Sequence, residues 1–355
     1  MDICILGMKG NFNKNLGQGV QIYNYQIWNN LKHKLKPPSH IYKAELGFGN
    51  TLTIRKITFT LAQAMHNFSK YDLVHIPSPI MFNPPGRGQK VTTLHELFLL
   101  EKNHPLRNYG KPNIKIHNPL TEFIGESILN QIMGSDYLLP NSTQTFSEAA
   151  ALGYPKDRMI IVNHAIDDKF IKCKVNKTNP TKFTVGYLGA MHDRKNVQFA
   201  IKSFMLFNKN SAVFQIWGNI KPEHTQLLQL ASTDSRIEFK GFAPESIKTN
   251  IYSNFDVFIF PSLYEGFGIE LLEAQALGIP VIIYKKSKIP KETRKYCFEA
   301  KDEEHAAHLI DEIMKNGYPE TKRKVAMAYA RSFTWEKCAK ETLNAYKKII
   351  SNNYF

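Results

Sequence analysis

Short runs of apolar, β-favouring residues alternate along the chain with segments whose apolar positions recur every three or four residues. The runs predict strands at residues 2–6, 71–76, 90–94, 136–140, 159–162, 183–188, 212–217, 237–240, 256–260 and 280–284. The helical spacing predicts helices at 20–35, 120–133 and 333–350, and another that Asn141 or Ser142 caps and Gly153 ends. Because strands and helices alternate, the pattern favours an α/β fold with doubly wound, mostly parallel sheets.

The pattern is interrupted at residues 171–182, which are polar, rich in Lys and Asn, and closed by Pro180. We interpret this stretch as a linker, after which a second α/β unit begins. A chain of 355 residues is long enough for about two domains. The expected domains are therefore residues 1–170 and 171–334, followed by the C-terminal helix.

Composition excludes several classes of protein. The chain is 43% hydrophobic and 22% charged, which is typical of a soluble globular protein, and no apolar run reaches the roughly 18 residues that span a bilayer. The first residues resemble a strand rather than a signal peptide. The four cysteines are scattered without metal-binding spacing. We therefore expect a cytoplasmic protein with reduced thiols and no metal.

Positive charge is concentrated in the first third of the chain. The formal net charge is +15, and residues 1–117 hold 15 Lys or Arg against five Asp or Glu, a difference of +10. Such an excess attracts nucleic acid, anionic lipid headgroups or a phosphorylated substrate. The alternative is a general preference for Lys in this composition, without a partner.

The segment 261–273 contains the most informative chemistry. It follows a predicted buried strand, passes through a glycine-containing loop, and enters a helix that Gly278 and Pro280 end. Backbone amides at such a helix start can hold an anion. Glu265 and Glu273 lie two helical turns apart, and carboxylates prefer hydroxyl groups to phosphate as partners. An anion that also carries hydroxyl groups indicates a nucleotide-sugar.

Five segments, in the correct order, resemble the GT-B fold retaining glycosyltransferases of family 4, also called glycosyl transferases group 1. They are residues 93–97, 185–196, 241–244, 256–281 and 332–336. The resemblance implies two Rossmann-like domains that face each other across a cleft. Residues 1–170 would bind the acceptor, residues 171–334 would bind the donor, and the C-terminal helix, 335–355, would pack back on the first domain.

The resemblance also implies roles for individual residues. Glu273 would bind ribose hydroxyls, Lys195 would pair with the diphosphate, and Glu265 and His95 would lie by the donor sugar, so that His95, Glu265 and Lys195 form the catalytic set. The remaining donor contacts implied are Gly17, Gly19, Gly189, Arg194, Gly241, Phe242, Gly266, Phe267, Gly268 and Ile269.

This chain departs from the family at one of these positions. Ala190 stands where the family has a second phosphate-binding arginine. Arg194 either replaces that charge or is a surface residue. We interpret Glu270 as a solvated helix charge, and the acidic runs 167–168 and 302–304 as structural rather than metal-binding.

The resulting hypothesis is transfer of a sugar, with retained configuration, from a UDP- or GDP-sugar to a glycan or lipid-linked acceptor, without metal or cofactor. The basic first domain would contact an anionic membrane surface. The alternatives are a nucleotide-sugar epimerase of the same fold, a basic nucleic-acid-binding or membrane-binding protein, and a glycosyltransferase that has lost activity. No standard nucleic-acid-binding motif is present, and the absence of G-x-G-x-x-G argues against NAD.

Overall fold

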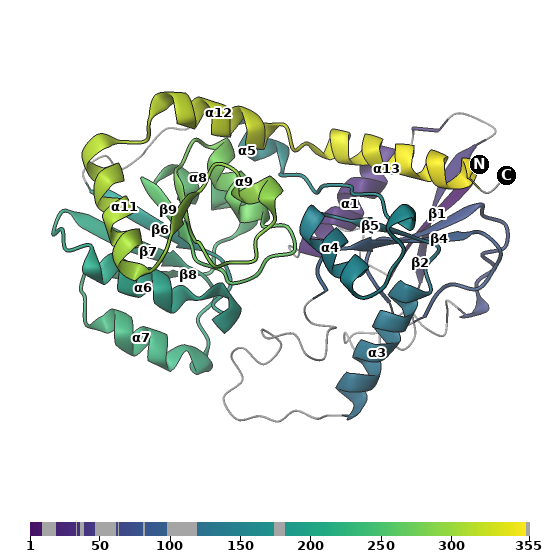
Figure 1. Ribbon diagram of the computed structural model, residues 1–355, viewed down its shortest axis with the longest axis horizontal. Helices are drawn as coiled ribbons and strands as arrows, with labels where there is room; N and C mark the ends of the chain where they lie inside the picture. Colours follow the sequence, from purple (N-terminus) through teal and green to yellow (C-terminus); the bar gives the residue numbers. More distant parts are fainter. Residues whose placement is uncertain are drawn as a thin grey trace. The chain divides into compact units, whose positions relative to one another are not determined.

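The chain folds into two compact units (Figure 1). The computed structural model describes residues 1–8, 19–32, 34–35, 39–46, 62, 64–80, 82–97, 119–173 and 182–352. Unit 1 contains the described residues up to Ala165 together with the C-terminal helix from Trp335, and unit 2 contains Ile166–Thr334. Gly17 lies outside the described residues, as does most of the expected linker.

Unit 1 is built on a parallel sheet in the order β2-β1-β3-β4-β5. The strands are β1 (Asp2–Met8), β2 (His40–Leu46), β3 (Leu73–Ile76), β4 (Gln89–Leu94) and β5 (Tyr137–Pro140). Its helices are α1 (Gly19–Leu31), α3 (Pro119–Met133), α4 (Thr143–Ala151), the 3-10 turn Lys156–Arg158, and α13 (Trp335–Ser351).

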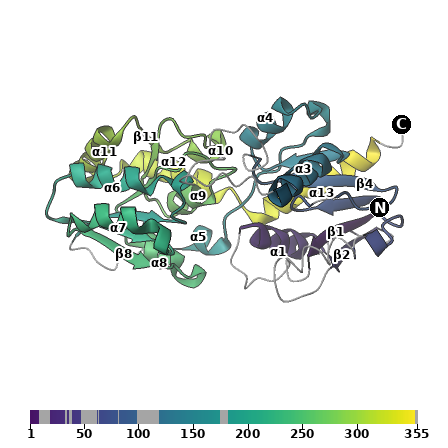
Figure 2. The same ribbon diagram turned by 90° about the horizontal axis from the view of Figure 1, so that it is seen from below.

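The C-terminal helix α13 belongs to the core of unit 1. It lies against α1, as the yellow helix in Figures 1 and 2, and its apolar face packs with Tyr23 and Ile27. Buried inside this contact, the Tyr346 hydroxyl lies 2.6 Å from His75 Nδ1, and His75 Nε2 lies 2.8 Å from Thr93 Oγ1. A polar link therefore joins α13 to the two central strands β3 and β4.

Unit 2 is built on a parallel sheet in the order β11-β10-β9-β6-β7-β8. The strands are β6 (Phe183–Leu188), β7 (Ala212–Trp217), β8 (Ile237–Gly241), β9 (Val257–Phe260), β10 (Val281–Tyr284) and β11 (Phe298–Ala300). The α-helices are α5 (Asp168–Lys172), α6 (Val197–Leu206), α7 (Thr225–Ser232), α8 (Lys248–Ser253), α9 (Ile269–Ala276), α10 (Lys291–Arg294), α11 (Glu303–Asn316) and α12 (Glu320–Arg331). Short 3-10 turns cover Asp193–Lys195, Pro222–His224 and Glu245–Ile247.

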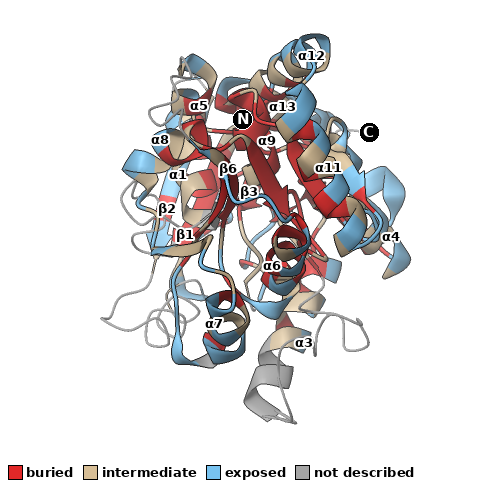
Figure 3. Ribbon diagram, turned by 90° about the vertical axis from the view of Figure 1, so that its left-hand side faces the viewer, coloured by how far each residue is buried: buried red, intermediate tan, exposed pale blue. Residues whose placement is uncertain are grey.

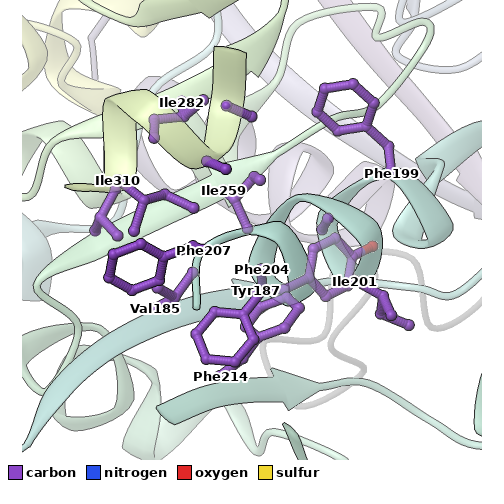
Figure 4. Packing of buried hydrophobic residues seen from close by; sticks show 14 of the residues in the cluster. Val185, Tyr187, Phe199, Ile201, Phe204, Phe207, Phe214, Ile259, Ile282 and Ile310 are labelled. Carbon is purple, nitrogen blue, oxygen red and sulfur yellow. The ribbon is translucent and has the colours of Figure 1, made fainter. Parts of the chain in front are cut away.

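Both faces of the unit 2 sheet are covered by apolar clusters. Because side chains alternate along a strand, Val257 and Ile259 of β9 enter the cluster formed with α6 and α11, part of which is drawn in Figure 4. Phe258 and Phe260 enter the opposite cluster, with α8 and α9. Strands buried on both faces, such as β6 and β3 in Figure 3, have mostly apolar sequences without a polar side to the strand. This is why the sequence predicted most of them.

Several predicted elements are wrong. Residues 159–162 form no strand. Met159 makes an isolated bridge with Leu138, and the amides of Ile160 and Val162 donate to the carbonyls of Leu138 and Pro140 in β5. The first helix ends at Leu31 rather than 35. Two strands were not predicted: β2, whose residues are mostly exposed at the sheet edge, and β11, which has only three residues.

Candidate functional site

The candidate site of unit 2 lies where the strand order reverses. The chain starts at β6, adds β7 and β8 on one side, and then crosses to add β9, β10 and β11 on the other. In doubly wound sheets, ligands bind outside the carboxyl ends of the two strands at such a switch point. The loops after β6 and β9 are joined there, because the amide of Leu263 donates to the carbonyl of Arg194 at 2.8 Å.

Four charged side chains meet in these loops, and we call Arg194, Lys195, Glu265 and Glu270 the charge cluster. Lys195 Nζ lies 2.7 Å from Glu265 Oε1 and 3.5 Å from Glu270 Oε1. Arg194 Nη1 lies 3.2 Å from the same Glu265 oxygen and also donates to the Tyr264 carbonyl. The structure therefore brings three predicted site residues into direct contact, and Arg194 is not an isolated surface residue.

Lys195 and Glu265 of the cluster are buried, and Lys195 stays charged despite its burial. Lys195 is only 5% exposed, and burial by itself lowers the pKa of its ammonium group. The carboxylates of Glu265 and Glu270 outweigh that effect, so the pKa of Lys195 lies above its ordinary value. Burial likewise raises the pKa of Glu270, but Lys195 and more distant cations bring it below the ordinary value. Two cations thus face two carboxylates.

The interpretation of Glu270 as a solvated helix charge is wrong. Its side chain is 27% exposed and ion-paired with Lys195. It stands in the first turn of α9, where a carboxylate also interacts favourably with the helix dipole. Sequence reasoning missed its place in the cluster because Lys195 reaches Glu270 only when β6 and β9 are neighbours.

The start of α9 is shaped by glycine. Gly268 precedes the helix with φ +86°, a left-handed conformation that residues other than glycine rarely adopt, and as the N-cap residue it has no side chain to cap the helix. The first amides of a helix lack helical partners, so this end suits an anion. The Phe267 side chain, in contrast, is buried against Phe333, with ring centroids 6.0 Å apart. It belongs to the hydrophobic core.

Glu273 lies further along α9 and is only 5% exposed. Its Oε2 accepts a hydrogen bond of 3.2 Å from the Tyr252 hydroxyl. Burial raises the pKa of Glu273 to about 7, Lys248 opposes this shift, and the charge of Glu270 adds to it. Lys248 itself is ion-paired with Glu245 at 2.7 Å. Burial disfavours the charged form of this carboxylate, and pKa values shifted in this way are common at functional sites.

Three glycines meet at the carboxyl ends of neighbouring strands. The amide of Gly189 donates to the Trp217 carbonyl at 3.0 Å, and the amide of Gly218 donates to the Gly241 carbonyl at 2.8 Å. The structure thus places Gly189 and Gly241 at the same carboxyl-terminal end of the sheet, with Gly218 between them. Phe242, the next residue, is 70% exposed. Gly218 was missed, although a glycine directly after the predicted strand 212–217 was a usable indication.

His95 lies in unit 1, directly after β4, and both of its ring nitrogens are occupied. Nε2 donates to the Pro77 carbonyl at 2.7 Å, so the neutral ring accepts at Nδ1 from His164 Nε2 at 2.8 Å. Burial lowers the pKa of His95 to about 4, so the ring is neutral at neutral pH. His164 was not predicted, and nothing in its local sequence indicated this contact. Gly19 begins α1 in the same unit.

The first residue of each acidic run, 167–168 and 302–304, caps a helix. Asp167 accepts from the Lys169 amide at the start of α5, and Asp302 accepts from the His305 amide at the start of α11, so the first residue of each run has a structural role. Among the described residues, no three His, Cys, Asp or Glu side chains gather as a metal site. None of the helices in that part of the chain has the length and apolar character needed to cross a bilayer.

The two doubly wound parallel units match the GT-B glycosyltransferase fold, as comparison with solved structures shows. Sucrose-phosphate synthase from Thermosynechococcus elongatus has this fold over 99% of this chain and 100% of its own, with a TM-score of 0.75 and 17% identity. Anabaena HepE, solved in complex with UDP, covers 98% of this chain and 100% of its own, with a TM-score of 0.68 and 14% identity. These likenesses confirm the predicted fold class.

The sequence matches point to the same group of enzymes. The model of the glycosyl transferases group 1 family matches residues 168–333, which make up nearly all of unit 2. The O-antigen chain mannosyltransferase B of Escherichia coli is 24% identical over 308 residues, which cover 81% of this chain and 77% of that protein. The capsular polysaccharide biosynthesis glycosyltransferase CapM of Staphylococcus aureus is 27% identical, over 45% of this chain and 41% of its own length.

Proposed function

We propose that this glycosyltransferase transfers a hexosyl residue, with retention of configuration, from a UDP- or GDP-sugar to a glycan or lipid-linked acceptor. The observation that carries the proposal is the buried charge cluster beside the start of α9, with the buried carboxylate of Glu273 on the same helix. Mannosyltransferases among the relatives, and UDP and UDP-glucose in complexes of HepE, indicate which donors to test first.

In the proposed donor complex, Lys195 and Arg194 bind the diphosphate, and Arg194 supplies the charge that is missing at Ala190. Arg194 suits this role because its guanidinium group can reorient from Glu265 to a phosphate while keeping its bond to the Tyr264 carbonyl. Glu273 accepts hydroxyl groups of the ribose. The other proposed contacts are Gly189, Gly266, Phe267, Gly268 and Ile269 to the phosphates, Gly241 and Phe242 to the nucleoside, and Gly17 and Gly19 to phosphate and acceptor.

In the proposed reaction, the bond between the anomeric carbon and the phosphate oxygen breaks, and negative charge develops on the departing diphosphate. Lys195 and Arg194 stabilise that charge in a site with little water. The acceptor hydroxyl forms the new bond on the same face of the sugar, and its proton passes to the departing phosphate. Glu265 orients the sugar, and His95 donates to a sugar hydroxyl by exchanging the Pro77 carbonyl for the substrate. These cations would take the role of a metal, so EDTA should leave the rate unchanged.

The test compares Lys195→Gln with Lys202→Gln, a matched change of an exposed lysine on α6. Thermal stabilisation is measured with UDP-glucose, GDP-mannose and the free diphosphates, followed by assays of nucleoside diphosphate release. We expect the wild type and Lys202→Gln to be stabilised by at least one nucleotide and to release its diphosphate with acceptor, whereas Lys195→Gln loses both. No stabilisation of the wild type by any nucleotide, or equal behaviour of the two variants, would contradict the proposal.

For unit 1, we propose peripheral contact with an anionic membrane that carries a lipid-linked acceptor. The support is the difference of +10 between basic and acidic residues in positions 1–117. Co-sedimentation with phosphatidylglycerol vesicles should fall steeply as salt increases, and vesicles of neutral phosphatidylcholine serve as the control. Equal binding to both vesicle types would contradict this role.

A further inference from the structure

Glu270 is a second carboxylate beside Lys195, whose charge Glu265 already neutralises. Glu265 already bonds to Lys195 at 2.7 Å and also faces Arg194, whereas Glu270 approaches the same ammonium group from the first turn of α9 at 3.5 Å. With both carboxylates the cluster has no net charge. Without Glu270 it would have one net positive charge, which suits an anionic ligand better. The chain therefore holds a negative charge where it weakens the binding of phosphate.

The repulsion from this charge differs between the donor and the product of the proposed reaction. A nucleotide-sugar carries about two negative charges, because its terminal phosphate is esterified. A free nucleoside diphosphate carries about three at neutral pH, because the terminal phosphate has a second pKa of about 6. A phosphate bound to Lys195 would lie within several Å of the Glu270 carboxylate, where charges interact strongly despite partial exposure.

We infer that Glu270 is a specificity-determining residue of the donor site, which competes with ligand phosphate for Lys195 and so favours nucleotide-sugar over nucleoside diphosphate. This inference depends on the proposed function, since it places the diphosphate at Lys195. In this role Glu270 weakens the binding of the nucleoside diphosphate product and so speeds its release. An ordinary first-turn glutamate would stabilise α9 without discriminating between the two ligands.

The experiment uses the full chain and compares Glu270→Gln with Glu304→Gln, an exposed first-turn carboxylate on α11. Dissociation constants are measured calorimetrically for UDP and UDP-glucose and for GDP and GDP-mannose, and the pair that the wild type binds is used. Glu270→Gln should bind both ligands more tightly, with the gain for the diphosphate about threefold to tenfold larger. Product inhibition should strengthen by the same ratio. Glu304→Gln should match the wild type.

The outcomes separate this inference from the proposed function. If the wild type binds no member of either pair, the proposed function fails. If the wild type binds but Glu270→Gln changes both affinities by the same factor, weakens them or leaves them unaltered, only the inference on Glu270 is overturned. Thermal unfolding of the unliganded variants identifies a merely structural effect, because loss of helix stabilisation changes the melting temperature without changing the ratio of the two dissociation constants.

Discussion

Replacing Glu273 by Gln should have opposite effects on stability and on donor binding. The Glu273 carboxyl is buried, and its pKa is raised to about 7 from an ordinary value of 4.5. Above pH 7 the folded protein without ligand holds an ionised carboxylate with limited compensation from the Tyr252 hydroxyl and the nearby cation Lys248. Glutamine has the same shape, still accepts from Tyr252, and carries no charge.

The size of the effect follows from the two pKa values. Because the folded pKa exceeds the unfolded one, Glu273 favours the folded state below pH 4.5, and this contribution is lost as the pH rises towards 7. At about 1.4 kcal/mol for each pH unit, the full loss is about 3 kcal/mol. Glu273→Gln should therefore be more stable than the wild type by up to about 3 kcal/mol at pH 8, with the difference vanishing near pH 4 to 5.

The assay is urea unfolding of the ligand-free full chain at intervals from pH 5 to 8.5, with Glu304→Gln as an exposed-carboxylate control. Calorimetry on the same variants then measures nucleotide binding. The expected result is a flatter pH dependence for Glu273→Gln, together with nucleotide binding weakened by about tenfold or more through loss of the charge-assisted bonds. An unchanged pH dependence, or lower stability at pH 8, would refute the burial argument. Unchanged nucleotide affinity would refute the ribose role.

Two further predictions concern a buried hydrogen bond and a close packing contact. Tyr346→Phe leaves the buried His75 Nδ1 without its hydrogen-bond partner and should lower the free energy of unfolding by about 1–3 kcal/mol in urea titrations. Tyr137→Phe, at a half-buried tyrosine, is the control. An equal effect of the two substitutions would contradict the reasoning. Gly186→Ala places a methyl group into the Phe255 ring and should cost about 1–3 kcal/mol. The double variant with Phe255→Leu should recover part of this loss in thermal unfolding, and a strictly additive cost would count against a steric cause.

Much of unit 2 was predictable because its central strands are buried on both faces. The run 256–260 is apolar throughout, since alternate residues enter two different clusters, and the following glycine loop and helix have clear local sequence. The edge strand β2 has no such run, because most of its side chains meet solvent, and it was missed. Segment 159–162 has apolar residues but forms only an isolated bridge, so the sheet and not the local pattern determined its state.

Some features of the site are likewise encoded in local sequence, whereas others depend on the tertiary structure. By itself, the sequence determined the two α/β units, the match of unit 2 to the glycosyl transferases group 1 model, and the loops that carry Lys195, Glu265 and Glu273, because local periodicity and motif spacing encode them. Only the tertiary structure decided that β6 lies beside β9, and hence that Lys195 pairs with both Glu265 and Glu270. Likewise, only folding buries Glu273 and so raises its pKa. Pairing and burial depend on residues far apart in the chain, and no local pattern records which of them will meet.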